Sequence, residues 1–152
     1  MPTDRNILRF LKIRIPALWF FGPRLVRLDG EVSEILIPLS WRTKNHLGVM
    51  YIGALCAGAD LAAGMGAARH IFAGPERVDL LFKDLHAEFL KRADGDVLFR
   101  SAEGRVVAEA VARTRETGDR VTVPVGVTAT VPSRYGEEPV ARFTMGLTLK
   151  RR

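Results

Sequence analysis

One segment, residues 49–66, constrains the fold of this chain more than any other. Between Val49 and Met65 it carries a single charged side chain, Asp60, and its apolar residues lie all round a helical wheel. A helix of this kind must be buried on every side. Glycine and alanine keep it thin, so that other backbone can approach closely. We therefore predict a central buried helix over 49–66 with the rest of the domain built around it.

The wider stretch 47–68 is also about as long as a membrane span. However, Asp60 near its middle is costly in a bilayer, and the stretch holds few Leu or Ile residues. The sequence favours a buried helix in a globular core over a transmembrane segment.

Strand patterns dominate the rest of the chain. Two runs, 121–131 and 141–149, alternate apolar and polar residues, and shorter strand candidates lie at 25–29, 32–39, 81–90 and 97–100. Strands with one apolar face are typical of an antiparallel sheet covered on a single side. A curved sheet wrapped around the central helix buries both apolar surfaces, so the pattern predicts the hotdog fold, of the α+β class.

Two further helices are expected outside the central one. In the N-terminal segment 1–22, apolar residues recur at helical spacing from Ile7, and Pro16 should kink or end the helix. We expect its apolar face to pack on the domain. The alternative is a membrane-surface or lid helix, since residues 19–21 are Trp-Phe-Phe and basic residues accompany them. The second helix is predicted over 101–117, with Gly118 as its C-cap.

Size and composition favour one domain over residues 1–152, since no internal repeat or linker divides the chain. Lys and Arg outnumber Asp and Glu by 23 to 17, which favours anionic partners. The cations are spread along the chain without interleaved aromatic rings, so nucleic acid is not an expected partner. No signal peptide is evident, because basic residues interrupt the first apolar residues.

Cysteine and histidine residues are few. The single cysteine, Cys56, cannot form an internal disulfide, which predicts a cytoplasmic protein, and we interpret it as a small core residue. The three histidines show no metal-ligand spacing, and no glycine-rich phosphate loop is present. The sequence therefore predicts neither a metal site nor a bound cofactor. We expect His70 to end the central helix, and we assign no role to His86.

Asp60 is the residue most suggestive of chemistry. Burying a carboxylate without partners is costly, so it either caps part of the structure or is retained for use. Desolvation raises the pKa of such a group, while hydrogen bonds to its ionised form lower it. Facing a substrate, it can act as a nucleophile or as a general base on water.

The sequence also resembles a known family. The run Asn-His-Leu-Gly-Val-Met-Tyr-Ile-Gly-Ala-Leu at 45–55, followed by Asp60, resembles the active-site signature of hotdog thioesterases of the phenylacetic-acid-degradation type. The order of elements along nearly the whole chain is similar to the DUF4442 branch of that superfamily. The resemblance implies an acyl-CoA thioesterase whose site lies at a dimer interface, in a homodimer or a dimer of dimers. Coenzyme A enters as part of the substrate, and the cations that hold it are not assigned.

The resemblance also implies roles for individual residues. Asp60 matches the acidic residue that attacks the thioester or activates water, and Asn45 matches the residue that orients the water or the substrate. Backbone N–H groups of Ile52 and Gly53 match the oxyanion hole, where a helix N-terminus presents unpaired donors. His46 is a candidate for positioning the substrate, with a loop histidine bonded to the backbone as the alternative.

Two departures from the family signature affect the functional interpretation. Tyr51-Ile52-Gly53 stands where the family commonly has His-Gly-Gly, and Phe82 replaces a polar hydroxyl residue on the next strand. The missing glycine favours a second hypothesis, a non-catalytic protein that binds acyl groups or acyl-CoA. A third is a basic protein that contacts a membrane surface weakly through residues 19–21.

Overall fold

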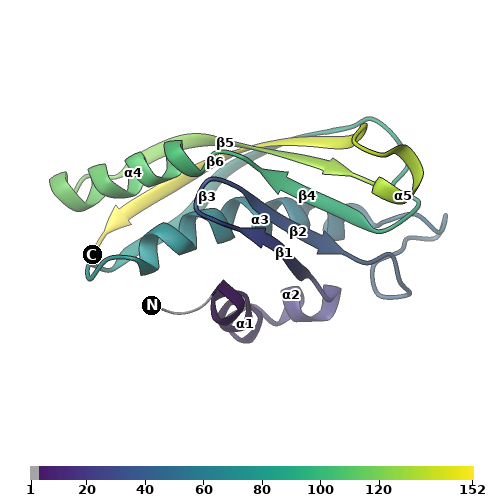
Figure 1. Cartoon of the computed structure of the whole chain (residues 1–152), viewed down its shortest axis with the longest axis horizontal. Helices are drawn as coiled ribbons and strands as arrows, with labels where there is room; N and C mark the ends of the chain where they lie inside the picture. The colour runs from purple at the N-terminus through teal and green to yellow at the C-terminus, as the bar shows by residue number, and fades with distance from the viewer. Residues whose placement is uncertain (1–3) are drawn as a thin grey trace.

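The computed structural model describes residues 4–152, which form one curved antiparallel sheet over a long central helix (Figure 1). The six strands lie in the order β1-β2-β4-β5-β6-β3, and all neighbours run antiparallel. They are β1 (Arg24–Leu28), β2 (Ser33–Ile37), β3 (Val78–Phe89), β4 (Val97–Ser101), β5 (Val121–Thr130) and β6 (Pro139–Arg151). The predicted α+β hotdog fold is confirmed.

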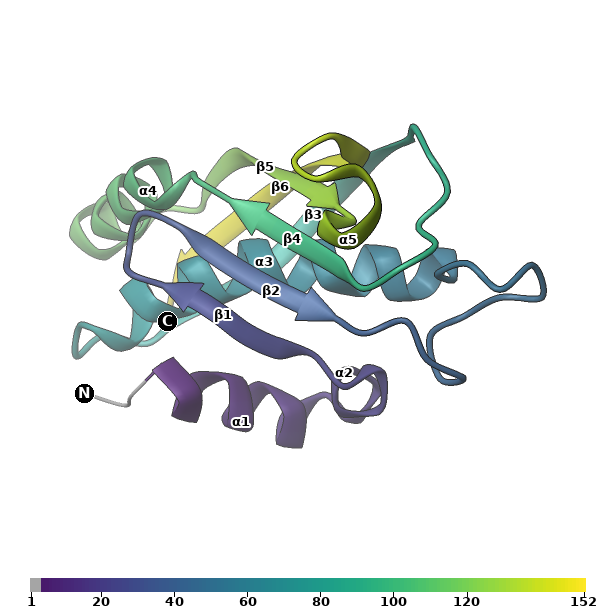
Figure 2. The ribbon, with the colours of Figure 1, turned by 45° about the vertical axis from the view of Figure 1, so that its right-hand side comes forward.

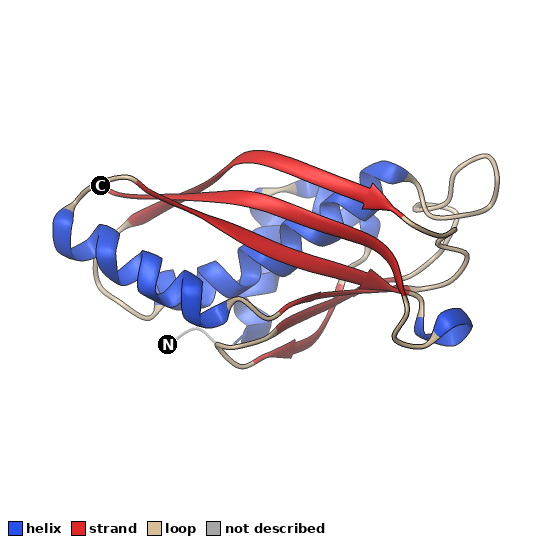
Figure 3. Cartoon of the chain, turned by 90° about the horizontal axis from the view of Figure 1, so that it is seen from above, coloured by secondary structure: helices blue, strands red, loops and turns tan. Residues whose placement is uncertain are grey.

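Five helices accompany the sheet within the described residues, and seen from above the long strands cross over the central one (Figure 3). They are α1 (Asp4–Arg14), α2 (Pro16–Phe21), α3 (Ile52–Phe72), α4 (Gly104–Thr117) and α5 (Pro132–Tyr135). The central helix α3 lies under the sheet, and α1 and α2 lie on its far side (Figure 1). The predicted C-cap of α4 is confirmed, since Gly118 adopts a left-handed conformation with φ 73°.

The central helix starts and ends later than the predicted range 49–66. The N–H of Met50 donates to the carbonyl of Ala93 (2.9 Å), and that of Tyr51 to the carbonyl of Thr43 (2.7 Å). These long-range bonds hold the chain extended up to Tyr51, so α3 begins at Ile52. Neither α3 nor any other helix within residues 4–152 is long and apolar enough to cross a membrane.

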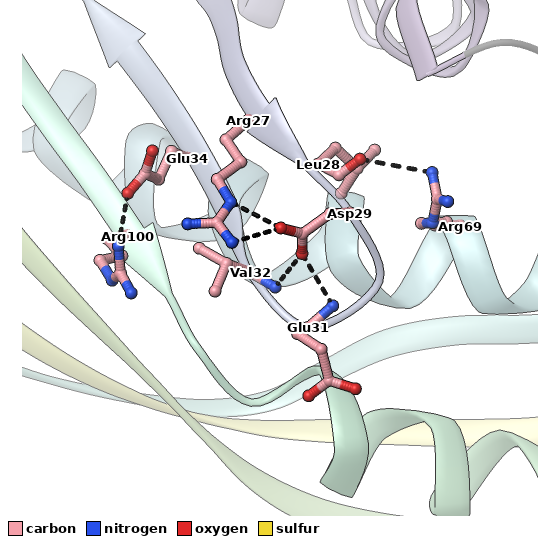
Figure 4. A network of polar contacts seen from close by, with 8 residues as sticks. All are labelled: Arg27, Leu28, Asp29, Glu31, Val32, Glu34, Arg69 and Arg100. Atoms are coloured by element: carbon pink, nitrogen blue, oxygen red, sulfur yellow. Dashed lines mark hydrogen bonds and ion pairs between the residues drawn. The ribbon is translucent and has the colours of Figure 1, made fainter.

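A tight turn that begins at Asp29 joins β1 to β2 (Figure 4). The Asp29 carboxylate accepts hydrogen bonds from the N–H groups of Val32 (2.8 Å) and Glu31 (3.0 Å) and from the guanidinium of Arg27 (2.6 Å). The bond from Val32, followed by that from Arg27, lowers the pKa of Asp29 to about 2. The Asp29 side chain therefore stabilises the backbone of the turn in which it lies.

The same turn anchors the far end of α3. Arg69 donates to the carbonyl of Leu28 (3.3 Å; Figure 4), and the His70 Nε2 atom lies 2.9 Å from the Gly30 carbonyl oxygen. These contacts explain why the helix continues past residue 66 to Phe72 and why His70 does not end it.

The N-terminal segment forms two helices because Pro16 interrupts it. Ile15 has a non-helical conformation, α2 starts at Pro16, and Gly22 closes it with φ 66°. Residues 1–3 of the predicted N-terminal helix lie outside the described residues. Helix α1 lies beneath α3 (Figures 1 and 2), and the Phe10 ring meets the Phe72 ring edge-on at 5.9 Å.

Strand β3 forms one edge of the sheet and leaves apolar side chains uncovered. Leu81, Leu85 and Phe89 are 71%, 42% and 48% exposed. We predicted that the apolar face of this segment is covered, but in a single chain these three side chains are exposed to solvent. Unpaired edge strands of this kind readily pair with another chain.

Close packing between α3 and the sheet depends on Gly58. A Cβ atom built there would lie only 2.2 Å from the buried ring of Phe99 on β4. Six residues later on the same helix, a Cβ atom at Gly64 would meet nothing within 4 Å. The two glycines therefore allow a matched comparison of packing and helix propensity.

We expect Gly58→Ala to destabilise the protein by about 1–3 kcal/mol, because the added methyl group overlaps the Phe99 ring. Gly64→Ala should instead stabilise it by up to about 1 kcal/mol, since alanine lowers the entropy of the unfolded chain at an open helical position. Urea unfolding at equal protein concentration measures both changes. Equal stability of the two variants would contradict this account of the core.

Candidate active site

One stripe along α3 is only half-buried, contrary to the prediction that this helix is buried on every side. The stripe consists of Gly53, Cys56, Ala57, Asp60 and Gly64. Within the described chain, the residues of α1 and β3 that face Asp60 leave this stripe partly exposed. Cys56 belongs to it, so the prediction of a core cysteine is only partly right, and burial raises the pKa of its thiol.

Asp60 lies in the middle of this stripe without a polar partner in residues 4–152. Burial raises the pKa of Asp60 above its usual value of 3.8. A carboxylate that is poorly solvated and makes no hydrogen bond is a stronger base than one in water. The structure therefore gives Asp60 the properties that a general base or a nucleophile needs.

Two cavities meet at Asp60. The larger, of about 590 Å³, lies between α1, α3 and the start of β3. The second, of about 460 Å³, is open and lies beside the middle of β3. It is lined by residues of α3, β3 and β6, namely Cys56, Ala57, Asp60, Phe82, Lys83, Asp84, Leu85 and Met145.

The larger cavity has mainly apolar walls. Helices α1 and α2 and the residue between them contribute Phe10, Leu11, Ile15 and Leu18, while α3 contributes Leu61, Gly64, Ala68, Ile71 and Phe72. The absent side chain of Gly64 leaves much of this space empty. The cavity volume falls within the range of small-molecule sites. An apolar group placed there lies directly beside Asp60.

Several charged side chains line the same cavity. Glu76 pairs with Arg115 (3.4 Å) and Asp79 with Arg152 (2.6 Å). Arg14 and Arg77 line it as well. The apolar cavity therefore combines a buried carboxylate with exposed guanidinium groups.

Strand β3 bulges beside Asp60. The register with β6 shifts between Phe82 and Leu85, and the Asp84 carboxylate accepts a hydrogen bond from the N–H of Gly146 (2.9 Å). Bulges commonly occur next to active sites, where they redirect side chains. Here the bulge presents Lys83 to the cavity of Asp60.

Asn45 stabilises the loop before α3. Its side-chain oxygen accepts hydrogen bonds from the N–H groups of Leu47 (2.9 Å) and Val49 (3.3 Å), and its own N–H donates to the carbonyl of Val49 (2.7 Å). The side-chain amide nitrogen has no acceptor within residues 4–152. It is therefore available to a water molecule or a substrate.

A third cavity, of about 420 Å³, brings most of the other predicted site residues together. Asn45, His46 and Ile52 all line it, as do Phe89 at the end of β3 and the cations Lys91 and Arg92. The first N–H groups of α3, on Ile52 and Gly53, have no carbonyl partner within the described chain. A helix start with free donors suits a developing oxyanion.

Within one chain, this cavity is separate from Asp60. Asp60 lies eight residues beyond Ile52 on α3, which corresponds to about 12 Å along the helix axis. The structure thus brings Asn45, His46 and Ile52 together, with Gly53 next in the chain but outside the lining, and it does not bring Asp60 into the same cavity. Their catalytic roles stay a prediction.

Several residues that line the cavities of the candidate site could not be recognised from the sequence. Leu11, Ile15 and Leu18 read as an ordinary packing face, yet they form a wall of the larger cavity. Lys83 and Arg92 did not stand out among 23 basic residues. Gly64, one turn after Asp60, was the one available signal, since a small residue beside a buried carboxylate leaves room for a ligand. Within residues 4–152, no three His, Cys, Asp or Glu side chains form a group that could hold a metal ion.

Solved structures from several bacteria share this fold. A protein of unknown function from Pseudomonas aeruginosa, described as a probable thioesterase, is 21% identical with a TM-score of 0.79, over 100% of this chain and 99% of that chain. A thioesterase from Haemophilus influenzae is 14% identical with a TM-score of 0.71, over 98% and 91% of the two chains. A protein of unknown function from Chlorobaculum tepidum is 11% identical with a TM-score of 0.82, over 98% and 94%.

No curated protein matches the sequence. Residues 3–149 match DUF4442, a domain of unknown function. Because that match spans nearly the whole chain, the protein belongs to the DUF4442 family.

Proposed function

We propose that this protein hydrolyses acyl-CoA thioesters, with Asp60 as the base or nucleophile. The observation that carries the proposal is a desolvated carboxylate at the junction of an apolar cavity and an open cavity. The apolar cavity between α1 and α3 suits the acyl group, while the open cavity beside β3 leaves an approach for the rest of the substrate. The thioesterase descriptions of proteins with the same fold support this reaction class.

The reaction follows one of two routes. As a base, Asp60 accepts a proton from a water molecule whose oxygen adds to the thioester carbon, and the C–S bond then breaks to release coenzyme A as its thiolate. As a nucleophile, Asp60 displaces that thiolate to form a mixed anhydride, which water then hydrolyses. Both routes place negative charge on the carbonyl oxygen, which the N–H groups of Ile52 and Gly53 are suited to stabilise. Neither route uses a metal or a resident cofactor.

A complete site requires a second copy of the chain. Antiparallel pairing of β3 with its copy places the Phe89 end of one strand against the Val78 end of the other. Phe89 belongs to the cavity of Asn45, and Phe82 belongs to the cavity of Asp60. Self-pairing therefore moves Asn45 of one copy towards Asp60 of the other, and it covers the exposed side chains of the edge strand.

The same pairing brings cations to the substrate. Lys83 lines the cavity of Asp60, and Arg92 lines the cavity of Asn45. Lys91 is already paired with Glu138 at 2.8 Å. We assign Lys83 and Arg92 to the phosphate groups of coenzyme A. This substrate, and the lone Cys56, agree with a cytoplasmic location.

A non-catalytic acyl-binding protein is the second candidate, and one observation favours it. The Tyr51 ring lies against the start of α3, where a Cβ atom at Gly53 would be only 2.2 Å from its Cε1 atom. The ring therefore narrows access to the donors that the oxyanion needs. Binding of acyl-CoA by a folded protein that releases no thiol would select this function.

The first test replaces Asp60 with asparagine. Thiol release from a panel of acyl-CoA substrates should fall at least about a hundredfold, because the amide cannot accept a proton or attack the thioester. Binding of a non-hydrolysable acyl-CoA thioether should persist. In the wild type, the raised pKa of Asp60 should shift the acidic limb of the kcat profile above the usual pH range of an aspartate.

Unfolding experiments provide the control for this variant. Because the pKa of Asp60 is raised in the folded state, its contribution to stability is fully present below its unfolded pKa and is lost as the pH rises through its folded pKa. Asp60→Asn should therefore be at least as stable as the wild type at neutral pH, and its relative stability should increase with pH. An active Asp60→Asn protein would exclude Asp60 from the reaction.

The second test asks whether two chains share one site. Asp60→Asn and Asn45→Ala chains should each be inactive alone, whereas co-expressed chains should regain about a quarter of the wild-type activity, because half of the random dimers hold one intact site. Mixed dimers purified through a different tag on each chain should show about half of the wild-type activity, because each holds one intact site of two. A site contained within one chain would show none.

The third test addresses the acyl cavity. Gly64→Leu should lower kcat/KM for long-chain acyl-CoA at least about tenfold while sparing acetyl-CoA, because the leucine fills the space between α3 and α1. Gly66→Ala on another face of α3 is the control, since its Cβ meets only the Ser33 Cβ at an ordinary 3.8 Å. An equal loss for short and long chains would argue against an acyl group in this cavity.

A further inference from the structure

An aromatic surface remains that the proposed active site does not use. It consists of Trp19 and Phe20 on α2 and Trp41 in the loop after β2, and we call it the aromatic corner. Their exposed fractions are 68%, 44% and 74%. The Phe20 and Trp41 rings meet edge-on, with centroids 6.0 Å apart. Two segments distant in sequence thus form one apolar surface, and both views place the loop beside α2 (Figures 1 and 2).

The backbone under the aromatic corner is held in place. Leu18, only 4% exposed, anchors α2 in the core. In the loop, the hydroxyl of the buried Thr43 donates to the carbonyl of Pro38 (2.7 Å), and its oxygen accepts a hydrogen bond from the N–H of Ser40 (2.9 Å). The exposure of these rings is therefore a fixed feature of the surface. Contiguous exposed apolar rings on a fixed scaffold are typical of an interaction site.

Basic groups surround the aromatic corner. The Arg42 guanidinium lies beside the C-cap of α2, since a Cβ atom at Gly22 would be 3.5 Å from its Nη2 atom. The Lys12 ammonium donates to the carbonyl of Pro23 (2.8 Å), and Arg24 is exposed at the start of β1. Residues 5–28 and 35–59, which include both segments, contain no Asp or Glu. From another segment, the Asp96 carboxylate accepts a hydrogen bond from the N–H of Leu39 (2.8 Å) in the same loop. Three basic side chains against one carboxylate make the charge around the rings mainly positive.

We propose that the aromatic corner docks the protein on an anionic lipid bilayer. Tryptophan rings prefer the headgroup region of a bilayer, and neighbouring Lys and Arg side chains are attracted to anionic lipids. A short helix with apolar rings and a basic surround can lie in this interface without spanning the membrane. An anionic bilayer can bind both the aromatic rings and the basic side chains, whereas a neutral bilayer can bind the rings alone. The inference is independent of the proposed hydrolysis.

The chain carries its own probe for this surface, because Trp19 and Trp41 are its two tryptophans. Vesicles of phosphatidylcholine with phosphatidylglycerol should shift tryptophan emission to shorter wavelength and sediment with the protein. Vesicles of phosphatidylcholine alone should do so much less, and high salt should release the protein. Equal binding to both vesicle types, or no binding to either, would overturn the proposal.

Substitutions locate the contact. Trp19→Ala with Trp41→Ala, and separately Arg42→Ala, should weaken sedimentation with anionic vesicles at least about tenfold. The matched controls lie on α4, where Val106→Ala and Arg105→Ala change exposed residues far from the aromatic corner and should leave binding unchanged. All five positions are exposed, and circular dichroism checks that each variant folds. Unchanged vesicle binding in the double tryptophan variant would overturn the proposal. A change in the oligomeric state of that variant without lipid would also overturn it, because the rings would then contact a second copy of the chain.

Discussion

The close contact between α3 and the sheet is the constraint on which the rest of the structure depends. The Phe99 ring occupies the space where any side chain at residue 58 would lie. Because α3 is built largely of glycine and alanine, the sheet can curve over it and bury the inward side chains of four strands, among them Ile35, Val125 and Leu147. A bulkier helix would hold the sheet away and open voids in the core.

The same thinness accounts for the candidate site. A helix without bulk leaves a stripe that its own chain does not cover, and Asp60 lies in that stripe. Helix α1 closes one side but does not fill the space above Gly64, which leaves an apolar cavity next to the carboxylate. The desolvation that raises the pKa of Asp60 is thus a consequence of packing, since no cation or hydrogen bond within the described residues opposes it.

The free edge of the sheet links the fold to the proposed assembly. Strand β3 pairs with β6 on one side only, and its exposed apolar residues lie between the cavity of Asp60 and that of Asn45. In the proposed dimer, pairing with a second copy would satisfy the unpaired backbone groups, cover these side chains and join the two cavities. Pairing of β3 with its copy would therefore stabilise the sheet edge and also complete the proposed active site. The aromatic corner lies at the opposite edge, near β1, and stays accessible in such a dimer.

The sequence by itself determined the fold class, because the all-round apolar helix and the alternation in β5 and β6 are local patterns with one compatible architecture. It also determined helix ends at Pro16, Gly22 and Gly118, where single residues restrict the backbone, and it singled out Asp60 by charge alone. Only the tertiary structure decided where α3 begins, that Asn45 and Asp60 line separate cavities, and that α1 forms a wall beside the carboxylate. These features arise from contacts between residues far apart in the chain, and no local pattern encodes such distances.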